Sequence, residues 1–198
     1  MTHSAVSILK YAFAHPDSIN LAIATLLVTG LRAGELLGLM PSDIDFKHGY
    51  INVDRMEQTR TQLIVDRCKD DSNRLVYLSP DSEMVLKKAL EIYNASNTGT
   101  DFLFANPNSA DYKLHLRALD NRLRKIQHEL KFTDYSPERS PHDCRRTYAS
   151  IQYLHGVDIK TIQAQLGHAT EHQTWEYIKD IADISTRAEK LKKGCIFA

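Results

Sequence analysis

Apolar residues recur at helical spacing along most of the chain. The spacing predicts one helix over residues 3–14, which include "ILKYAF". It predicts a second helix over residues 18–29, most of which lie in the apolar segment "INLAIATLLVTG". Asp17 or Ser18 can accept hydrogen bonds at the start of the second helix, and Gly30 can end it. The segment "AGELLGL" then predicts one or two further helical turns before a proline.

A different pattern follows in the middle of the chain. The segments "GYINVDR", "TQLIVDR" and "RLVYLS" are short, rich in branched residues and separated by polar turns, so we expect a three-stranded antiparallel meander. A helix resumes at "SPDSEMVLKKALEIYNAS", with Ser79 as its cap and Pro80 in its first position. From Asp111 onward the apolar spacing is again helical. The predicted fold class is α+β, mainly α-helical, with one small three-stranded sheet.

Composition indicates the broad class of protein but does not change the predicted helices and strands. The 198 residues, 42% hydrophobic and 25% charged, predict one globular domain over residues 1–198, either an ordinary one or a large one of two lobes. No apolar run is long enough for a membrane helix, which requires roughly 18 residues. Three scattered cysteines without a CxxC pair argue against a disulfide framework and for a reducing, cytoplasmic location. A formal net charge of zero argues against nonspecific nucleic-acid binding by the whole surface, although a local basic face is compatible with it.

The first candidate for chemistry is "TGLRAGELLGL". Arg32 follows the glycine that ends a helix, and its guanidinium can bind an anion with two parallel hydrogen bonds. Glu35, three residues later, can hold that guanidinium in place. The alternative is an ordinary surface ion pair, which contributes little to stability.

The second candidate is "SPHDCRRTYAS", residues 140–150. Pro141 suits the first position of a helix, which places His142 and Arg145 on one face of the first turn. The free N–H groups there favour a phosphate, and His142 can transfer a proton near neutral pH. Arg146 points about 100° away from Arg145, so the two adjacent arginines are not expected to serve one phosphate. The alternative is a helix with a solvated basic edge.

Two further segments carry polar residues at defined places. In "LGHATEHQTWEYIKD", His168 follows the helix-ending Gly167, and Tyr177 lies on the next helix, where a tyrosine is usually a core residue. His168 and His172 have no cysteine or third ligand at the usual spacing, so no metal is expected. In "CKDDSNRLVYLS", Lys69 falls in a turn between two predicted strands, where a lysine is either solvated or able to enter a groove.

These four segments, in this order, resemble the sequence boxes of the tyrosine recombinases, the phage-integrase family. "TGLRAGELLGL" is similar to the first arginine box, "CKDDSNRLVYLS" to the β-hairpin lysine segment, "PHDCRRTYAS" to the His-x-x-Arg box and "LGHATEHQTWEYIKD" to the last box. The resemblance covers nearly the whole chain and is closest to integrases of bacterial mobile elements. Cys144 stands where the family usually has leucine, and Arg146 where histidine is frequent.

The resemblance implies the catalytic-domain fold of that family and DNA cleavage through a 3′-phosphotyrosine, without metal, ATP or other cofactor. The implied catalytic residues are Arg32, Lys69, His142, Arg145, His168 and the nucleophile Tyr177. Within this set the lysine would protonate the departing 5′-oxygen. Glu35 would orient the first arginine, and Arg74 and Arg146 would contact DNA.

The resemblance also implies partners. We expect double-stranded DNA as the substrate, a free monomer that forms a homo-tetramer on DNA, no membrane association and a place at the bacterial nucleoid. Residues 178–198 would form a C-terminal tail that docks on a neighbouring subunit or folds back on its own domain. N-terminal core-binding and arm-binding domains would be missing from this chain. The alternatives are a type IB topoisomerase-like enzyme, which nicks and reseals DNA, and a DNA-binding module without chemistry.

Overall fold

The structure, a computed structural model, describes residues 2–58, 60–66, 74–96, 98–132 and 140–178. The chain forms two compact units, residues 1–148 and 149–198, which are described separately. The helices that lie wholly in the first unit are α1 (Thr2–Ala14), α2 (Ser18–Thr29), α3 (Ala33–Leu37), the 3-10 turn η1 (Pro41–Asp43), α4 (Pro80–Ser96) and α5 (Leu116–Glu129). The strands are β1 (Ile44–Asp45), β2 (Tyr50–Val53), β3 (Arg55–Glu57), β4 (Ile64–Asp66) and β5 (Arg74–Tyr77).

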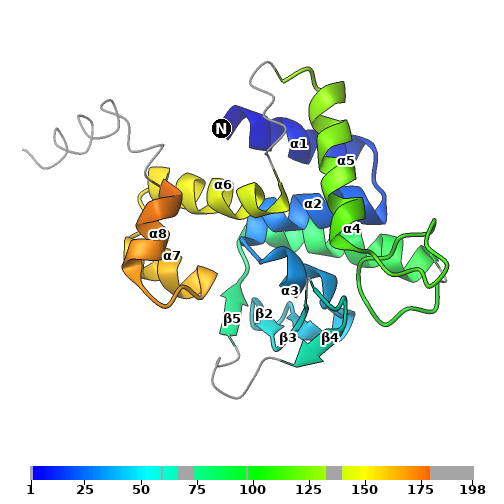
Figure 1. Cartoon of the computed structure of the whole chain (residues 1–198). Helices are drawn as coiled ribbons and strands as arrows, with labels where there is room; N and C mark the ends of the chain where they lie inside the picture. Colours follow the sequence, from blue (N-terminus) through cyan, green and yellow to red (C-terminus); the bar gives the residue numbers. More distant parts are fainter. Residues whose placement is uncertain (1, 59, 67–73, 97, 133–139, 179–198) are drawn as a thin grey trace, which may run out of the picture. The chain divides into compact units, whose positions relative to one another are not determined.

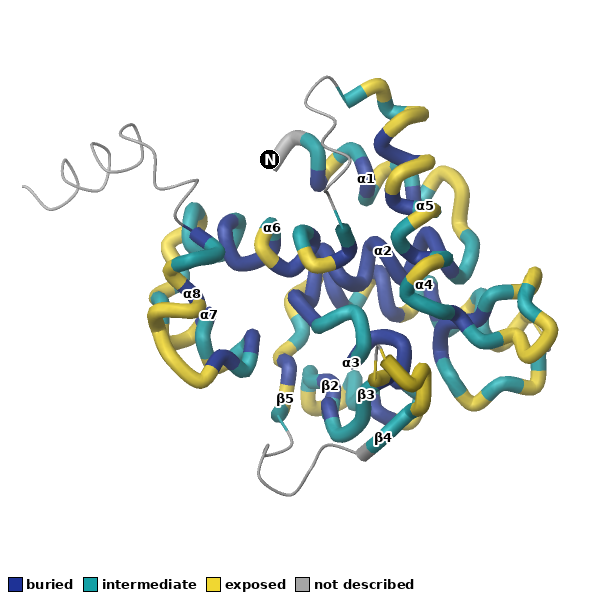
Figure 2. Tube along the Cα trace, in the orientation of Figure 1, coloured by how far each residue is buried: buried dark blue, intermediate teal, exposed yellow. Residues whose placement is uncertain are grey.

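Helix α2 forms the centre of the first unit. Its sequence is apolar on all sides, which is typical of a buried helix, and every residue after Ser18 is buried. It packs against α1, α4 and α5 (Figure 1), and Figure 2 shows it buried along its length. The hydroxyl groups of Thr25 and Thr29 bond the carbonyl oxygens four residues earlier, at 2.8 and 2.6 Å, so α2 buries no unsatisfied threonine hydroxyl.

Both predicted ends of α2 are confirmed. Asp17 is the N-cap, and its Oδ1 accepts a hydrogen bond from the Asn20 N–H at 2.7 Å. Gly30 ends the helix in the left-handed conformation, with a φ of 68° that favours glycine, and its N–H bonds the Leu26 carbonyl. The chain therefore leaves the core in a fixed direction immediately before Arg32.

Helix α3 packs closely on strand β3. A Cβ atom at Gly34 would lie 2.6 Å from the carbonyl oxygen of Glu57, a separation that side-chain carbons do not adopt. The absence of a side chain at Gly34 therefore allows α3 to approach the strand. This contact places α3, with Glu35 on it, directly above β3.

The small antiparallel sheet is confirmed, but the predicted meander is wrong in its pairing. The three-stranded sheet has the order β1-β2-β5, and Ile51 of β2 pairs with Val76 of β5. Strand β4, from "TQLIVDR", pairs instead with β3 in a separate two-stranded sheet. The physical reason lies in "GYINVDR", which is interrupted at Asp54. The guanidinium of Arg55 bonds the carboxylates of Asp43 at 2.7 Å and Asp54 at 3.1 Å, so one predicted strand becomes two with different partners.

The later helices match their predicted positions. Ser79 caps α4, since its Oγ accepts from the Ser82 N–H at 3.2 Å. Helix α6 (Pro141–Leu154) begins at the predicted proline within the first unit and ends in the second. The second unit continues with α7 (Ile159–Leu166) and α8 (Glu171–Ile178). Within the described ranges, no helix combines the length and the apolar character needed to cross a membrane.

Candidate active site

The first part of the candidate site is a pair of arginines on one carboxylate. Glu35, whose side chain is fully buried, accepts from Arg32 Nη1 at 2.9 Å and from the Arg32 backbone N–H at 2.8 Å. The same carboxylate accepts from Arg74 Nη2, at the start of β5, at 2.6 Å. Glu35 therefore orients Arg32 through two hydrogen bonds, while about a third of the Arg32 side chain stays exposed.

The charge state of Glu35 is set by these arginines. Burial alone would raise the pKa of this carboxyl, but the charges of Arg74 and Arg32 outweigh it and lower the pKa below the ordinary value of 4.5. The Arg32 N–H and the charge of Arg145 act in the same direction. Glu35 is therefore a carboxylate at neutral pH, surrounded by three cationic side chains.

Arg145 is almost completely buried, with 1% of the residue exposed. Its Nη1 donates to the carbonyl oxygen of Gly30 at 2.7 Å, which joins α6 to the end of the buried helix α2. A buried cation is costly unless hydrogen-bonded, so this contact fixes both the position and the direction of the guanidinium. Arg146, one residue later, is exposed, as its different direction on the helix predicts.

The first turn of α6 also sets the state of His142. The turn is capped by Asp143, whose Oδ2 accepts from the Ser140 N–H at 2.7 Å. The pKa of His142 is lowered below the ordinary value of 6.5. The main cause is partial burial of the ring, and the positive charges of Arg146 and Arg145 act in the same direction. His142 is therefore mainly the neutral imidazole at neutral pH, able to accept a proton. Cys144 is buried, and burial raises its pKa to about 12, so it is not a candidate nucleophile.

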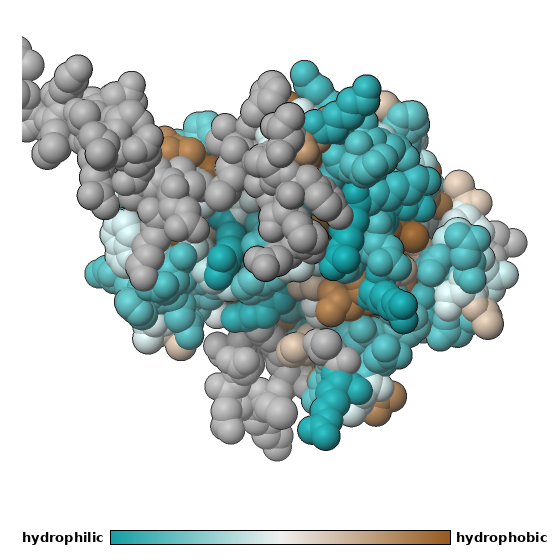
Figure 3. All heavy atoms as spheres, turned by 45° about the horizontal axis from the view of Figure 1, so that its top comes forward, coloured by the Kyte–Doolittle hydropathy of each residue, from teal (hydrophilic) through white to brown (hydrophobic). Residues whose placement is uncertain are grey.

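Arg32 and His142 line one open pocket of about 680 Å³ in the first unit. The opposite wall comes from α5, whose exposed face is hydrophilic (Figure 3) and carries Arg117 and Arg124. Arg124 is paired with Asp120 at 2.9 Å, whereas Arg117 is exposed and has no ion pair in the part of the chain that the structure describes. The pocket therefore presents cationic groups from two sides. Sequence reasoning missed both α5 arginines, although their seven-residue spacing places them on one helix face.

The second unit holds two of the predicted catalytic residues, His168 and Tyr177. His168 follows Gly167, which ends α7 in the left-handed conformation, and is mostly buried. Its Nδ1 lies 3.0 Å from the Thr174 Oγ1, and its ring lies edge-on to the Tyr177 ring with 4.8 Å between centroids. Tyr177 itself is partly exposed on α8, and its carbonyl accepts from the Ser150 Oγ at 3.2 Å. The structure thus places His168 and Tyr177 together, with the His168 Nδ1 beside the Thr174 hydroxyl.

Lys69 lies outside the described residues, so its role stays a prediction. Arg74, expected at the DNA, has its guanidinium on Glu35 with only 9% of its side chain exposed. No local sequence signal indicates this contact, because the two residues are 39 positions apart.

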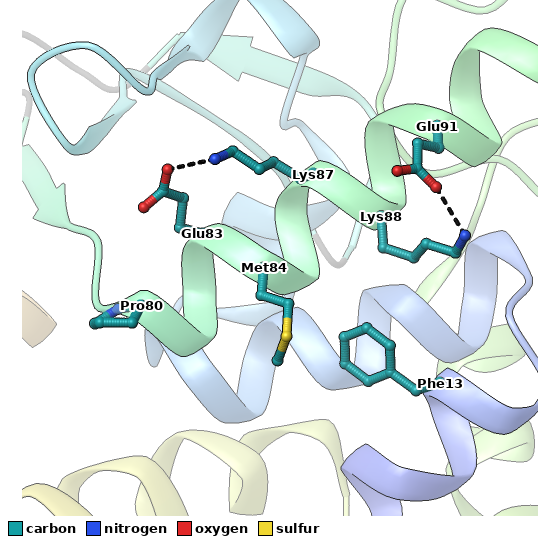
Figure 4. A pocket seen from close by; sticks show the side chains of 7 residues that line it. All are labelled: Phe13, Pro80, Glu83, Met84, Lys87, Lys88 and Glu91. Atoms are coloured by element: carbon teal, nitrogen blue, oxygen red, sulfur yellow. Dashed lines mark hydrogen bonds and ion pairs between the residues drawn. The ribbon is translucent and has the colours of Figure 1, made fainter.

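A second hollow in the first unit lies between α1 and α4 (Figure 4). Phe13 and Met84 point toward it, and its charged rim consists of Lys87 paired with Glu83 and Lys88 paired with Glu91. Mutually paired charges leave no group directed at a ligand, so this hollow is not the candidate site. The described residues contain no group of three possible metal ligands.

Comparison with known proteins identifies the family. The model of the phage integrase family matches residues 2–182, which is most of the chain. The chain belongs to this family, as the four sequence segments predict.

Known relatives carry recombinase and transposase names. The chain is 29% identical to the tyrosine recombinase XerA of Saccharolobus solfataricus over 87% of its own length and 49% of that protein. It is 28% identical to the transposase from transposon Tn916 of Enterococcus faecalis, over 84% of the chain and 43% of that protein. The chain thus spans about half the length of the curated relatives it matches.

Solved structures agree on the fold. A crystal structure of XerA recombinase aligns with a TM-score of 0.77 and 25% identity, covering 98% of this chain and 64% of that one. The Tn1549 transposon integrase, solved in complex with transposon right end DNA, aligns with a TM-score of 0.75 and 19% identity, covering 98% of this chain and 64% of that one. The predicted catalytic-domain fold of the tyrosine recombinases is confirmed.

Proposed function

We propose that this chain is the catalytic part of a site-specific DNA recombinase that cleaves and rejoins strands through a 3′-phosphotyrosine. The observation that carries the proposal is the fixed pair of cations. Arg32 is oriented by Glu35, and Arg145 is held by the Gly30 carbonyl. Guanidinium groups fixed before the reaction are suited to stabilise the charge that develops on a phosphodiester under attack.

The reaction assigns a role to each predicted residue. The Oη of Tyr177 attacks the phosphorus, forms a bond to the 3′-phosphate and displaces the 5′-oxygen. Neutral His142 accepts a proton as the attack proceeds, and Lys69 donates one to the departing oxygen, so that the proton balance closes. His168 donates a hydrogen bond to the phosphate. A 5′-hydroxyl of another strand reverses the step, so no ATP, metal or other cofactor is required.

The partners follow from this activity as further parts of the proposal. Double-stranded DNA is the substrate, and the arginines that line the pocket beside α5 supply contacts to its backbone. Relatives support DNA as the partner, since the Tn1549 integrase was solved with transposon end DNA. We propose a homo-tetramer on DNA, with residues 178–198, most of which lie outside the described part, docking in trans. Such an enzyme acts at the nucleoid of a bacterial cytoplasm.

The proposal is tested with nicked suicide duplexes made from the ends of the element that encodes this chain. We expect a protein–DNA adduct that survives detergent, and we expect Tyr177→Phe to abolish it while leaving DNA binding intact. Tyr153→Phe, a change of the same size on a neighbouring helix, is the matched control and should retain the adduct. An adduct that persists in Tyr177→Phe would contradict the assignment of the nucleophile.

Two alternatives are separated by further outcomes. A topoisomerase-like enzyme would relax supercoiled DNA without exchanging strands between two duplexes, and the names of the relatives do not favour it. A binding module would give no adduct at all. Strand exchange between two labelled duplexes is therefore the second measurement.

A further inference from the structure

The contact between Arg74 and Glu35 is not used by the reaction described above. Glu35 is fully buried and accepts hydrogen bonds from the Arg32 backbone N–H, from Arg32 Nη1 and from Arg74 Nη2, the last at 2.6 Å. Orientation of Arg32 requires only the first two. The question is what a second cation does on the same carboxylate.

The second cation changes the net charge of the cluster around Glu35. A carboxylate close enough to orient a guanidinium also cancels its charge, and cancellation is strongest where water is excluded. Without Arg74, the pair of Arg32 and Glu35 would be neutral beside the pocket. Arg145, whose charge also acts on Glu35, is almost completely buried and bonded to the Gly30 carbonyl. With Arg74 included, two positive groups and one negative group leave a net positive charge on the cluster. Of the two arginine side chains, that of Arg74 is 9% exposed and that of Arg32 is 36% exposed, so Arg32 is the one that can present this charge.

We propose that Arg74 is a positioning residue that balances the charge of Glu35, so that Arg32 is held in place without losing its charge toward the scissile phosphate. This inference rests on the proposed function and replaces the expected DNA contact of Arg74. Arg74 does not touch the substrate in this role and acts only through Glu35.

The test is a charge cycle of four proteins: the wild-type chain, Arg74→Met, Glu35→Gln and the double variant. Adduct formation on the suicide duplex is measured as a rate. We expect Arg74→Met to slow it by roughly 10- to 100-fold, because Arg32 is then neutralised and shifted. Glu35→Gln alone should also slow it, because two cations lose their shared counter-charge. Added to Arg74→Met, however, Glu35→Gln should raise the rate, because it removes the negative charge that cancels the charge of Arg32.

This reversal of sign is the decisive readout, since a purely structural role of Arg74 predicts two losses that add. Arg74→Lys keeps the charge and should retain most of the rate. Arg55→Met is the matched control. It removes a guanidinium from the carboxylate of Asp43, which is also mostly buried, and should destabilise the fold without slowing the adduct.

A second measurement keeps the inference separate from the proposed function. The Glu35 carboxyl is titrated by carbon NMR in the wild-type chain and in Arg74→Met, where we expect a higher pKa. If the wild-type chain forms no adduct but this shift occurs, the proposed function fails and the shared contact stands. A Glu35 titration unchanged by Arg74→Met, or a double variant no faster than Arg74→Met, overturns the inference.

Discussion

At the scale of single residues, the candidate site consists of charges held at fixed places by groups that do not react. Glu35 orients Arg32, and the carbonyl of Gly30 orients Arg145. Both contacts are short and charge-assisted, which makes them stronger than neutral hydrogen bonds, and the contact of Arg145 is also buried. Rigid placement of this kind lowers the reorganisation that a phosphate would otherwise impose on the site.

The acid sensitivity of the fold follows from Glu35. Its pKa is lowered in the folded state, so its contribution to stability is present above the ordinary pKa of 4.5 and is lost as pH falls through the folded-state value. We expect the wild-type chain to be more stable than Glu35→Gln at pH 7 and the difference to shrink as the pH falls below about 4.5. Urea unfolding of both proteins over this range checks the prediction. A difference that stays constant with pH would show that the ionised carboxylate is not the source.

The sequence predicts individual residues at the site better than it predicts their contacts. The pairing of Arg32 with Glu35 follows from a spacing of three residues at a helix start. Arg74 and Glu35 are 39 positions apart, and Arg145 and Gly30 are 115 positions apart. Local sequence patterns do not predict contacts between such distant residues. For this reason the sequence alone predicts a DNA contact for Arg74, whereas the structure places its guanidinium on Glu35.

At the scale of elements, the site depends on how closely α3 approaches β3. The helix carries Glu35 and begins immediately after Arg32. Its distance from the strand is set by Gly34, where a side chain has no space. A change in this packing should therefore reach the arginines without altering any charged residue.

We expect Gly34→Ala to destabilise the fold by about 1–3 kcal/mol, because the new methyl group would meet the Glu57 carbonyl at 2.6 Å and backbone must move. The adduct rate should fall as well, since α3 is displaced. Gly38→Ala is the matched control on the same segment, where a Cβ atom would lie 3.3 Å from an Arg55 side-chain carbon and 3.4 Å from Met56 backbone atoms, at the edge of ordinary contact. Thermal unfolding of both variants measures the difference, and equal effects would contradict the close approach.

Helices and sheets differ in how far the sequence determines them. The bounds of α2 and the first residue of α6 follow from apolar spacing and from Asp17, Gly30 and Pro141, all of which act within a few residues. Strand pairing is decided by distant partners, and the break at Asp54 depends on a contact of the neighbouring Arg55 with Asp43 from an earlier turn. The order β1-β2-β5 was therefore beyond prediction from strand patterns.

At the scale of the whole molecule, the proposed function requires a chain with zero formal net charge to bind a polyanion through a local surface. The pocket that contains Arg32, His142 and the α5 arginines is such a surface within the first unit. Its negative residues are already paired, Asp120 with Arg124 and Glu57 with Lys113 at 3.1 Å. The pocket can therefore be locally positive although the formal net charge of the whole chain is zero.

We expect this chain alone to bind DNA weakly at physiological salt, with an affinity that falls steeply as salt rises. Arg117→Ala should weaken binding on all sequences and reduce the logarithmic salt slope by about one. Lys87→Ala removes a lysine paired with Glu83 on the hollow of Figure 4 and should leave the slope unchanged. Fluorescence anisotropy over a salt series measures both. Tight binding by the wild-type chain at physiological salt would refute the first expectation.

The hydrogen bond of Arg145 to the Gly30 carbonyl also bears on whether a misfolded copy of the protein can cleave DNA. An enzyme that breaks DNA is dangerous when damaged, and the acceptor for Arg145 is main chain at the end of the most buried helix. A copy whose core has loosened loses that helix end, and with it the alignment of the guanidinium. On the proposed function, DNA cleavage therefore requires a folded core, and a misfolded copy does not cleave DNA.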